Sequence, residues 1–291
     1  MARYKVGIDG GGTSCRARII DDNNQLVGEA KSGSANIMLG AELAMQSIID
    51  SIEQAATQGG LDASSFSQMD VGLALAGAEH KASYHAFMNT AHPFASVTLN
   101  TDGYGACLGA HQGEDGAIMI AGTGSVGLYI QGNTQHVVGG REFPISDQGG
   151  GAVMGLRLIQ QVLLIQDGIK PPSPLAEIVM THFNHDIDAI VEWSKSALPR
   201  DYGQFSPAIF EYAYLNDNLA KSLLQQTADD IEMFLCALNQ RGADKICLMG
   251  SIAERIFDWL SPAAQRWIVA PQGDAMDGAL MMAGTEKHNL Y

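Results

Sequence analysis

The stretch that decides the fold is Val-Gly-Ile-Asp-Gly-Gly-Gly-Thr-Ser, residues 6–14, in which a glycine-rich turn follows an apolar strand-like run. Three consecutive glycines carry no Cβ atom, so their backbone N–H groups can close around a bulky anion such as a phosphate. Thr13 and Ser14 add hydroxyl donors, and Asp9 stands at the strand end, where it could hold a magnesium ion through water. Because an Asp-Gly step also makes an ordinary tight hairpin, this turn alone leaves both interpretations open.

A second turn of the same kind follows about one domain length later, in Gly-Ala-Ile-Met-Ile-Ala-Gly-Thr-Gly-Ser-Val-Gly-Leu-Tyr-Ile, residues 116–130. Each copy contains a strand-like run, a glycine turn, a second and a third strand-like run, and later a helix. The runs are 4–9, 15–20 and 26–30 in the first copy, and 117–121, 126–130 and 135–138 in the second. This duplication predicts two similar halves that face each other and hold the phosphates of a nucleotide between their turns.

Strands alternate with helices along the rest of the chain, which predicts an α/β fold with covered sheets. We expect a first domain over 1–108 and a second over 109–277, with a terminal helix at 278–290 that packs back on the first domain. The prolines of Lys-Pro-Pro-Ser-Pro, residues 170–174, open an all-helical insert that extends to about residue 240 in the second domain.

Length and charge limit the class of protein. A chain of 291 residues is longer than one core usually spans, so two domains are expected. The formal net charge of −15 argues against nucleic acid or an anionic membrane surface as a partner. No apolar run has the pattern of a signal peptide or the length of a membrane span, and we expect a cytoplasmic protein. The sequence leaves a homodimer open.

Asp102 follows the strand-like run 97–101 and precedes a short helix. One interpretation is a helix N-cap, whose side chain accepts a hydrogen bond from the first turn. The other rests on its position at the carboxyl end of a strand, where open α/β sheets bind ligands. A carboxylate that faces a phosphate donor can take the proton of an attacking hydroxyl, so Asp102 is also the candidate catalytic base.

Three further segments are candidates for ligand contacts. Asn36 either starts a helix or presents its amide to a polyol. Residues 139–151 contain five glycines, one proline and three charged side chains ahead of an apolar helix. A plain loop does not need so many glycines, so we interpret it as a substrate loop, with Glu142 and Asp147 accepting from hydroxyl or amine groups. Gly250, after the strand-like run 245–249, either makes a simple turn or lets an adenine ring lie against the backbone.

The motif series Asp9-Gly-Gly-Gly-Thr, Asp102-Gly, Ala121-Gly-Thr-Gly-Ser, Ser146-Asp-Gln-Gly-Gly, Met249-Gly-Ser and Gly278-Ala resembles the phosphate, connect and adenosine motifs of the sugar kinase/Hsp70/actin superfamily. Within it, Asn36 and the 139–151 loop resemble the N-acetylglucosamine/glucosamine kinase branch of the BadF/BadG/BcrA/BcrD ATPase family. The resemblance covers essentially the whole chain and implies two ribonuclease H-like (actin-like ATPase) domains.

The same resemblance implies ATP and Mg²⁺ as cofactors, a small amino sugar as substrate, and Asp102 as the base for its 6-hydroxyl. It implies Asp9 as the magnesium residue, acting through water. The residues implied for ATP are Gly10, Gly11, Gly12, Thr13, Ser14, Thr123, Gly124, Gly250 and Ser251. The residues implied for the sugar are Asn36, Asp102, Ser125, Val126, Gly140, Arg141, Glu142 and Asp147.

One departure from the family pattern bears on the substrate. N-acetylglucosamine kinases usually carry Gly-Trp-Gly where this chain has Arg141-Glu142-Phe143, and a glycine where it has Ser146. An apolar ring suits an acetamido methyl group, whereas the carboxylate of Glu142 suits an ammonium group. The loop therefore favours glucosamine as the substrate, with N-acetylglucosamine as the alternative.

Two further alternatives belong to other functional classes. The family also contains the ATP-driven activator of a 2-hydroxyacyl-CoA dehydratase, which needs cysteines to hold an iron–sulfur cluster at a dimer interface. None of the four cysteines of this chain lies in a glycine-rich loop. A polymerising or chaperone-type relative of actin or Hsp70 needs additional subdomains, for which 291 residues leave no room.

Overall fold

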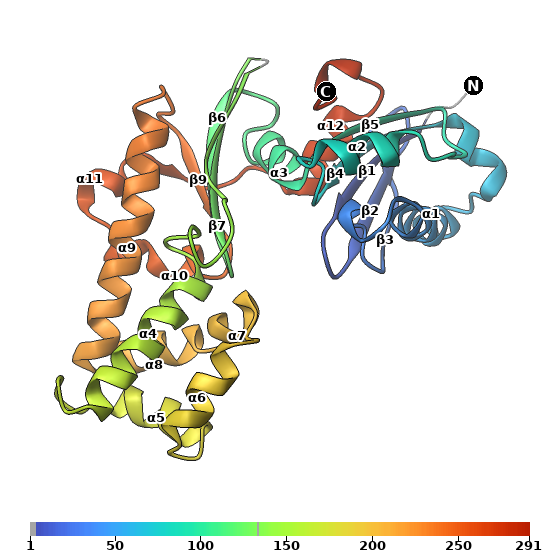
Figure 1. Cartoon of the computed structure of the whole chain (residues 1–291). Helices are drawn as coiled ribbons and strands as arrows, with labels where there is room; N and C mark the ends of the chain where they lie inside the picture. The colour runs from blue at the N-terminus through green and yellow to red at the C-terminus, as the bar shows by residue number, and fades with distance from the viewer. Residues whose placement is uncertain (1–3, 133) are drawn as a thin grey trace. The chain divides into compact units, whose positions relative to one another are not determined.

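The computed structural model describes residues 4–132 and 134–291, and these residues form two compact units (Figure 1). The first unit contains the described residues up to 116, those of 130–134, and 270–291; the second contains 117–129 and 135–269. Within the described residues, no helix combines the length and the apolar character that crossing a membrane requires.

The first unit is built on a five-stranded sheet in the order β3-β2-β1-β4-β5. Strands β1, β4 and β5 are parallel to one another, whereas β2 and β3 are antiparallel to their neighbours. The strands are β1 (Tyr4–Gly10), β2 (Cys15–Ile20), β3 (Leu26–Ser32), β4 (Met69–Leu75) and β5 (Ser96–Thr101). The helices of this unit are α1 (Ala41–Gln58), α2 (Lys81–Met88), α3 (Asp102–Ala110) and α12 (Ala275–Met282), with 3-10 turns η1 (Ile37–Leu39), η2 (Ala63–Gln68) and η4 (Glu286–His288).

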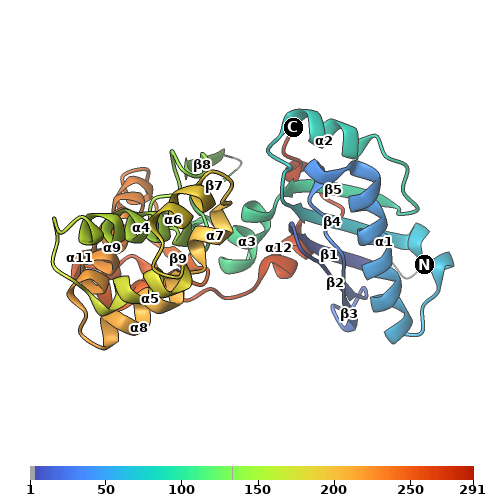
Figure 2. The same cartoon turned by 60° about the horizontal axis from the view of Figure 1, so that its bottom comes forward.

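Helices cover both faces of this sheet. The side chains of a strand alternate between the two faces, so each face can pack against a helix. Val6 and Ile8 of β1 are fully buried in one core cluster with Ile48 of α1 (Figure 2). Gly7, which lies between them on the opposite face, packs against the backbone of α12. The sheet is therefore a covered layer with its parallel strand ends left for the connecting loops.

Glycines let α12 approach α3 and the sheet at backbone distance. A Cβ atom built on Gly278 of α12 would lie 1.9 Å from the carbonyl oxygen of Gly105 in α3. A Cβ atom on Gly72 of β4 would lie 1.9 Å from the carbonyl oxygen of Ala279. No side chain fits at these positions unless a helix moves.

We therefore expect Gly278→Ala to destabilise the first unit by about 3 kcal/mol, because the added methyl group meets backbone that cannot rotate away. Thermal unfolding followed by circular dichroism should show a midpoint lower by about 5 °C or more. Gly12→Ala is the matched control, because a Cβ atom at Gly12 meets nothing within 4 Å. Equal midpoints for the two variants would contradict the packing argument.

The second unit repeats the plan of the first. Its sheet has the order β10-β9-β6-β7-β8, so that β6, β7 and β8 correspond to β1, β2 and β3. The strands are β6 (Gly116–Ala121), β7 (Ser125–Gln131), β8 (Thr134–Gly139), β9 (Ile246–Met249) and β10 (Ile268–Val269). The shared order confirms the α/β class and the duplicated hairpin expected from the two glycine turns.

Between β8 and β9 the chain is helical, as the insert expected over 170–240 requires. The helices of this part are α4 (Gly151–Gln166), α5 (Pro174–His182), α6 (Ile187–Ser194), α7 (Pro199–Gly203), α8 (Ser206–Tyr214) and α9 (Asn218–Asn239). After β9 come α10 (Ala253–Ile256), η3 (Phe257–Trp259) and α11 (Pro262–Gln265). The inward faces of these helices form one apolar cluster with β6, in which Leu158, Ile209 and Leu235 are fully buried.

The end of the chain differs from the expected helix over 278–290. Helix α12 already begins at Ala275, because Asp274 and Asp277 form a capping box at its first turn. It ends at Met282, and Gly284 follows with a φ of +76°. Residues 270–277, expected in the second domain, group with the first unit, and the expected boundary at 108–109 falls inside α3.

Candidate functional site

The first glycine turn is tied to the segment that follows β3. Gly11 N–H donates to the carbonyl of Ser14 at 2.9 Å and closes the turn. The carbonyl of Gly11 accepts from Ala35 N–H at 3.1 Å and from the Ser34 hydroxyl at 3.1 Å. These bonds bring the segment that carries Asn36 beside the turn expected to hold phosphate.

The glycines of the two turns differ in whether the packing of the fold requires them. Gly10 is required by packing, because a Cβ atom there would lie 2.5 Å from the Leu75 side chain. Gly12 and Gly122 have neither a positive φ nor any protein atom within 4 Å of the missing Cβ. The fold does not demand a glycine at these two positions, so open space lies where a side chain would stand, and a bulky anion can approach the backbone of each turn there.

The second turn is fixed by backbone bonds to the start of α4. Gly151 N–H donates to the carbonyl of Gly122 at 2.7 Å, and Ala152 N–H donates to that of Thr123 at 2.9 Å. A Cβ atom on Gly124 would lie 2.7 Å from a carboxylate oxygen of Asp147. The contact with Asp147 therefore explains why a glycine stands at position 124.

Asp9 has a partner that the sequence analysis did not name. Arg16 lies opposite it in the antiparallel register of β1 and β2, and the Arg16 Nε donates to Asp9 Oδ2 at 3.0 Å. Arg16 also lies 3.8 Å from a carboxylate oxygen of Asp274 at the start of α12. The alternation of β2 gave the signal, because Arg16 and Arg18 point to the face opposite the buried Cys15 and Ala17. Any metal at Asp9 has to share or displace this ion pair.

Asp102 is not the N-cap that the simpler interpretation proposes. Thr101 caps α3, its hydroxyl accepting from Tyr104 N–H at 3.1 Å. Asp102 is the first helical residue, and its Oδ1 accepts from Gly103 N–H at 2.7 Å. The carboxylate thus stands just after β5, in the first turn of α3 and not at its N-cap position.

The surroundings of Asp102 raise its pKa above the ordinary aspartate value. Desolvation by the surrounding protein is the largest cause, and the negative charges of Glu79 and Asp9 add to it. Hydrogen bonding by Gly103 N–H opposes the rise. Asp102 is nevertheless exposed to solvent. A carboxyl group whose proton affinity is raised and which stays accessible suits a general base.

The loop after β4 is part of the same edge, and sequence analysis missed it. Leu75 ends β4 and pairs with Thr101 of β5, so Glu79 and Asp102 both follow neighbouring parallel strand ends. The carbonyl of Ala76 in this loop accepts from Ile37 N–H at 3.2 Å. A charged side chain shortly after a fully buried parallel strand was the available signal.

Asn36 begins the short helical turn η1, which agrees with the first of the two interpretations of its sequence position. Its Oδ1 accepts from Met38 N–H at 2.9 Å and caps η1. A Cβ atom on Gly77 would lie 2.8 Å from the same oxygen, so the amide stands against the loop after β4. The amide nitrogen of Asn36 is the atom that can donate to a hydroxyl of a ligand.

In the second unit, most of the expected sugar residues line one cavity of about 300 Å³. Its walls come from the second glycine turn, from β7 and from the 139–151 loop. The residues that line it are Ile120, Gly122, Thr123, Gly124, Ser125, Val126, Gly140, Glu142 and Asp147. Of the expected sugar residues on this unit, Arg141 is the one that does not line the cavity.

Two carboxylates face this cavity from strained backbone. Glu142 has a φ of +67° and Asp147 a φ of +68°, a region that non-glycine residues adopt rarely and chiefly where function or packing imposes it. Desolvation raises the pKa of Asp147, backbone N–H groups such as that of Ser125 lower it, and the charge of Glu142 raises it further. In the described part of the chain no lysine, arginine or histidine pairs with either carboxylate. Within the described residues, the cavity wall therefore carries two carboxylates that no cationic side chain meets at ion-pair distance.

The other residues of the loop serve its own fold. Phe143 turns inward and packs on Tyr202, with ring centroids 5.1 Å apart. Gly139, Gly140 and Gly149 have φ between +65° and +83°, and Gly150 touches the backbone of the second glycine turn. The glycine count, which favoured a substrate loop, is thus explained by backbone geometry. The feature of this loop that bears on ligand binding is therefore its pair of carboxylates.

An ion pair between α4 and α9 holds this loop, and no motif in the sequence indicates it. Arg157 of α4 donates to both carboxylate oxygens of Asp230 in α9, at 2.6 and 3.3 Å. Asp230 also accepts from Gly149 N–H at 3.1 Å. The pair therefore fixes the end of the 139–151 loop to two helices.

A second, narrower cavity of about 130 Å³ adjoins the same turn. Gly122 and Thr123 form one side of it, and Ser251 the other. Gly250 has a φ of +101°, and a Cβ atom there would lie 2.5 Å from the carbonyl oxygen of Ala121. The structure thus brings together two of the regions expected to hold ATP, the second glycine turn and the Gly250–Ser251 turn. Arg255 and Phe210 also line this cavity, with the guanidinium carbon of Arg255 4.1 Å from the ring centroid of Phe210.

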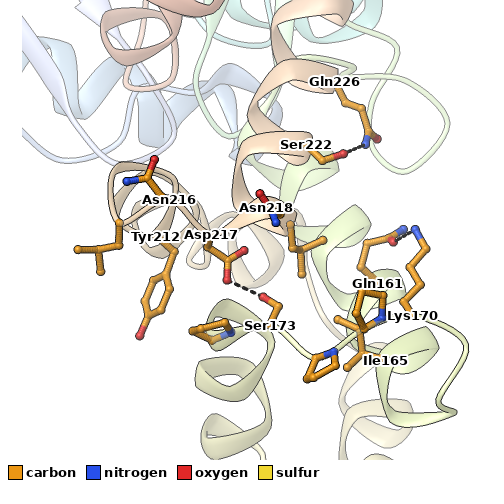
Figure 3. A pocket seen from close by; sticks show the side chains of 15 residues that line it. Gln161, Ile165, Lys170, Ser173, Tyr212, Asn216, Asp217, Asn218, Ser222 and Gln226 are labelled. Atoms are coloured by element: carbon orange, nitrogen blue, oxygen red, sulfur yellow. Dashed lines mark hydrogen bonds between the residues drawn. The ribbon is translucent and has the colours of Figure 1, made fainter.

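A larger cavity, of about 740 Å³, lies elsewhere, among the helices between β8 and β9 (Figure 3). Its buried carboxylate, Asp217, is fully used by the fold. Asp217 Oδ2 accepts from the Ser173 hydroxyl at 2.8 Å (Figure 3). Asp217 Oδ1 accepts from Ala220 N–H at 2.9 Å. Size alone does not identify a site here.

Comparison with known proteins agrees with these features. Residues 6–283 match the model of the BadF/BadG/BcrA/BcrD ATPase family. Glucosamine kinase GspK of Vibrio cholerae serotype O1 is 72% identical over 288 residues, covering 99% of this chain and 98% of the relative. N-acetyl-D-glucosamine kinase of Dictyostelium discoideum is 23% identical over 260 residues, covering 82% of this chain and 81% of the relative.

A solved structure from Chromobacterium violaceum, provisionally named an N-acetylglucosamine kinase, has a TM-score of 0.87 and 33% identity. The match covers 96% of this chain and 98% of that structure. This likeness confirms the expected fold of two actin-like ATPase domains. The chain therefore belongs to the BadF/BadG/BcrA/BcrD ATPase family.

Proposed function

We propose that this protein is an ATP-dependent kinase that phosphorylates the 6-hydroxyl of glucosamine. The observation that carries the proposal is the pair of carboxylates, Glu142 and Asp147, on the wall of a cavity whose other lining is uncharged. An ammonium group at C2 of the sugar is the counter-charge that such a wall lacks. The 72% identity to a glucosamine kinase supports the same substrate over N-acetylglucosamine.

Asp102 is the proposed base. It takes the proton of the 6-hydroxyl, the sugar oxygen forms its bond to the γ-phosphorus, and the bond to the β-phosphate oxygen breaks to release ADP. The raised pKa of Asp102 favours proton uptake as the hydroxyl becomes more acidic in the transition state. Asn36, on the same edge of the first sheet, is proposed to donate to a sugar hydroxyl.

The two glycine turns are proposed to bind ATP. The fit rests on Gly12 and Gly122, where the space that a side chain would fill is open although the fold does not require a glycine. Thr13, Ser14 and Thr123 supply hydroxyl donors at the same turns. Magnesium, when bound with ATP, neutralises charge on the phosphates, and Asp9 at the end of β1 is the residue proposed to hold it through water. Gly10, Gly11, Gly124, Gly250 and Ser251 complete the proposed ATP residues.

Gly12→Ala and Gly122→Ala should weaken the binding of ATP without lowering the midpoint of thermal unfolding. The new methyl group meets no protein atom but occupies the proposed phosphate space, so we expect the KM for ATP to rise about tenfold or more. Steady-state kinetics at saturating glucosamine, with thermal unfolding alongside, measure both effects. An unchanged KM for ATP in both variants would contradict the assignment of the turns.

The activator role considered for this family is disfavoured by the cysteines. Cys15, Cys107 and Cys247 are buried. Burial raises the pKa of the Cys15 and Cys247 thiols to about 11, which disfavours the thiolates that bind a cluster. The fourth, Cys236, is half-buried in α9 and has no cysteine neighbour within its helix.

The proposal is tested by ATP consumption with and without hexosamine, followed by identification of the product. We expect ATP turnover to depend on glucosamine, and phosphorus-coupled NMR to place the phosphate on O6. ATP turnover that is independent of sugar, or a phosphate on O1, would refute the proposed reaction.

A further inference from the structure

The segment 288–291 runs along the free edge of β5, the outer strand of the first sheet. Leu290 N–H donates to the carbonyl of Leu99 at 3.1 Å, and Leu99 N–H donates to the side chain of Asn289 at 2.9 Å. The side-chain amide of Asn100 donates to the carbonyl of His288 at 2.8 Å. The segment therefore pairs with the strand that ends immediately before Asp102.

The same segment also contacts the helix that Asp102 begins. The hydroxyl of Tyr104, two residues after Asp102 in α3, lies 2.8 Å from His288 Nδ1. Desolvation lowers the pKa of His288, and the charge of Lys287 lowers it further. His288 is therefore neutral at physiological pH, and its bond to Tyr104 does not depend on a charge.

Its last residue reaches the loop after β4. The Tyr291 hydroxyl donates to the carbonyl of Glu79 at 2.9 Å. The ring of Tyr291 meets that of Tyr84 in α2 edge to face, with centroids 5.0 Å apart, and the ammonium of Lys81 lies 5.5 Å from its centroid. In Figure 2 this end of the chain lies beside α2.

We infer that the segment 288–291 is a positioning element for the sugar side of the proposed kinase site, with Tyr291 fixing Glu79 beside Asp102. Glu79 and Asp102 follow the paired ends of β4 and β5, and the loop of Glu79 bonds on its other side to Ile37, next to Asn36. One short segment thus connects the strand that precedes the proposed base, the helix that the base begins, and the loop that stands against Asn36. The inference rests on the proposed function for its kinetic consequence, but its structural part stands independently.

Tyr291→Ala should raise the KM for glucosamine about fivefold to tenfold and leave the KM for ATP within about twofold. Tyr291→Phe keeps the ring contacts and loses the bond to Glu79, so it should show a smaller rise, about twofold to threefold. Tyr214→Ala, which removes a tyrosine 88% exposed in the insert, is the matched control and should change neither constant.

Amide hydrogen exchange of residues 76–80, measured on the same proteins, tests the structural part without any assay of activity. We expect faster exchange in this loop in Tyr291→Phe and Tyr291→Ala, and no change in Tyr214→Ala. Unchanged exchange, or an equal rise in the KM values for sugar and ATP, would overturn the inference. If Tyr291→Ala does not fold, Tyr291→Phe decides the question. Faster exchange in the Tyr291 variants, together with a wild-type protein that phosphorylates no hexosamine, would refute the proposed function and leave the structural part standing.

Discussion

Asp102→Asn is expected to lower kcat for glucosamine phosphorylation by about 10²–10⁴ with little change in the KM for the sugar. Asparagine keeps the shape of the side chain and an oxygen that can accept from Gly103 N–H at the first turn of α3. It cannot take the proton of the 6-hydroxyl, so the loss falls on the chemical step. Steady-state kinetics over a range of both substrates measure the effect.

The pH profile provides a second check on the same residue. A base acts only when deprotonated, so wild-type kcat/KM should fall on the acid side as Asp102 takes up a proton. Because desolvation and the charges of Glu79 and Asp9 raise the pKa of Asp102, this fall should lie above the ordinary range of an aspartate. This acid-side fall in kcat/KM should be absent from the residual activity of Asp102→Asn.

The control for this substitution is Asp50→Asn in α1, where the carboxylate accepts from the side chain of Gln46 one helical turn away. It should leave kcat unchanged. A loss of less than about tenfold in Asp102→Asn would mean that Asp102 shapes the start of α3 and takes no part in proton transfer.

Glu142→Gln is expected to lower kcat/KM for glucosamine about tenfold or more and to leave activity on glucose nearly unchanged. Glutamine keeps the size of the side chain and its ability to hydrogen bond, but it removes the charge that pairs with the ammonium group. Glucose carries a hydroxyl at C2 and has no charge to lose. Measuring both sugars with one preparation separates recognition of the amine from damage to the loop.

Asp147→Asn should also lower kcat/KM for glucosamine, because both carboxylates line the cavity. Glu177→Gln, on an exposed side of α5, is the control and should affect neither sugar. Equal losses for glucosamine and glucose in Glu142→Gln would show that the residue holds the loop and does not read the amine.

The sequence could predict the fold because its signals were local and repeated. The two glycine turns, each between strand-like runs, indicated the duplicated sheets, and the prolines at 171–174 marked the helical insert. The end of the chain was predicted less well. The capping box of Asp274 and Asp277 starts α12 earlier than the glycine motif suggested, and Gly284 stops it.

The candidate site was predictable in its residues but not in their partners. Arg16 meets Asp9 through strand register, and Asp230 reaches Gly149 from a helix 81 residues away in sequence. Contacts of this kind depend on tertiary packing, which a motif does not encode. The sequence also treats all glycines alike, whereas the structure separates Gly10, which packing requires, from Gly12, which it does not.

The most direct test of the account compares kcat/KM of the wild-type protein for glucosamine, N-acetylglucosamine and glucose, measured by ADP release at saturating Mg·ATP. The account predicts the highest value for glucosamine, because Glu142 and Asp147 give the cavity negative charge and Phe143, the aromatic residue of the loop, packs inward on Tyr202. A higher value for N-acetylglucosamine than for glucosamine would contradict the central claim.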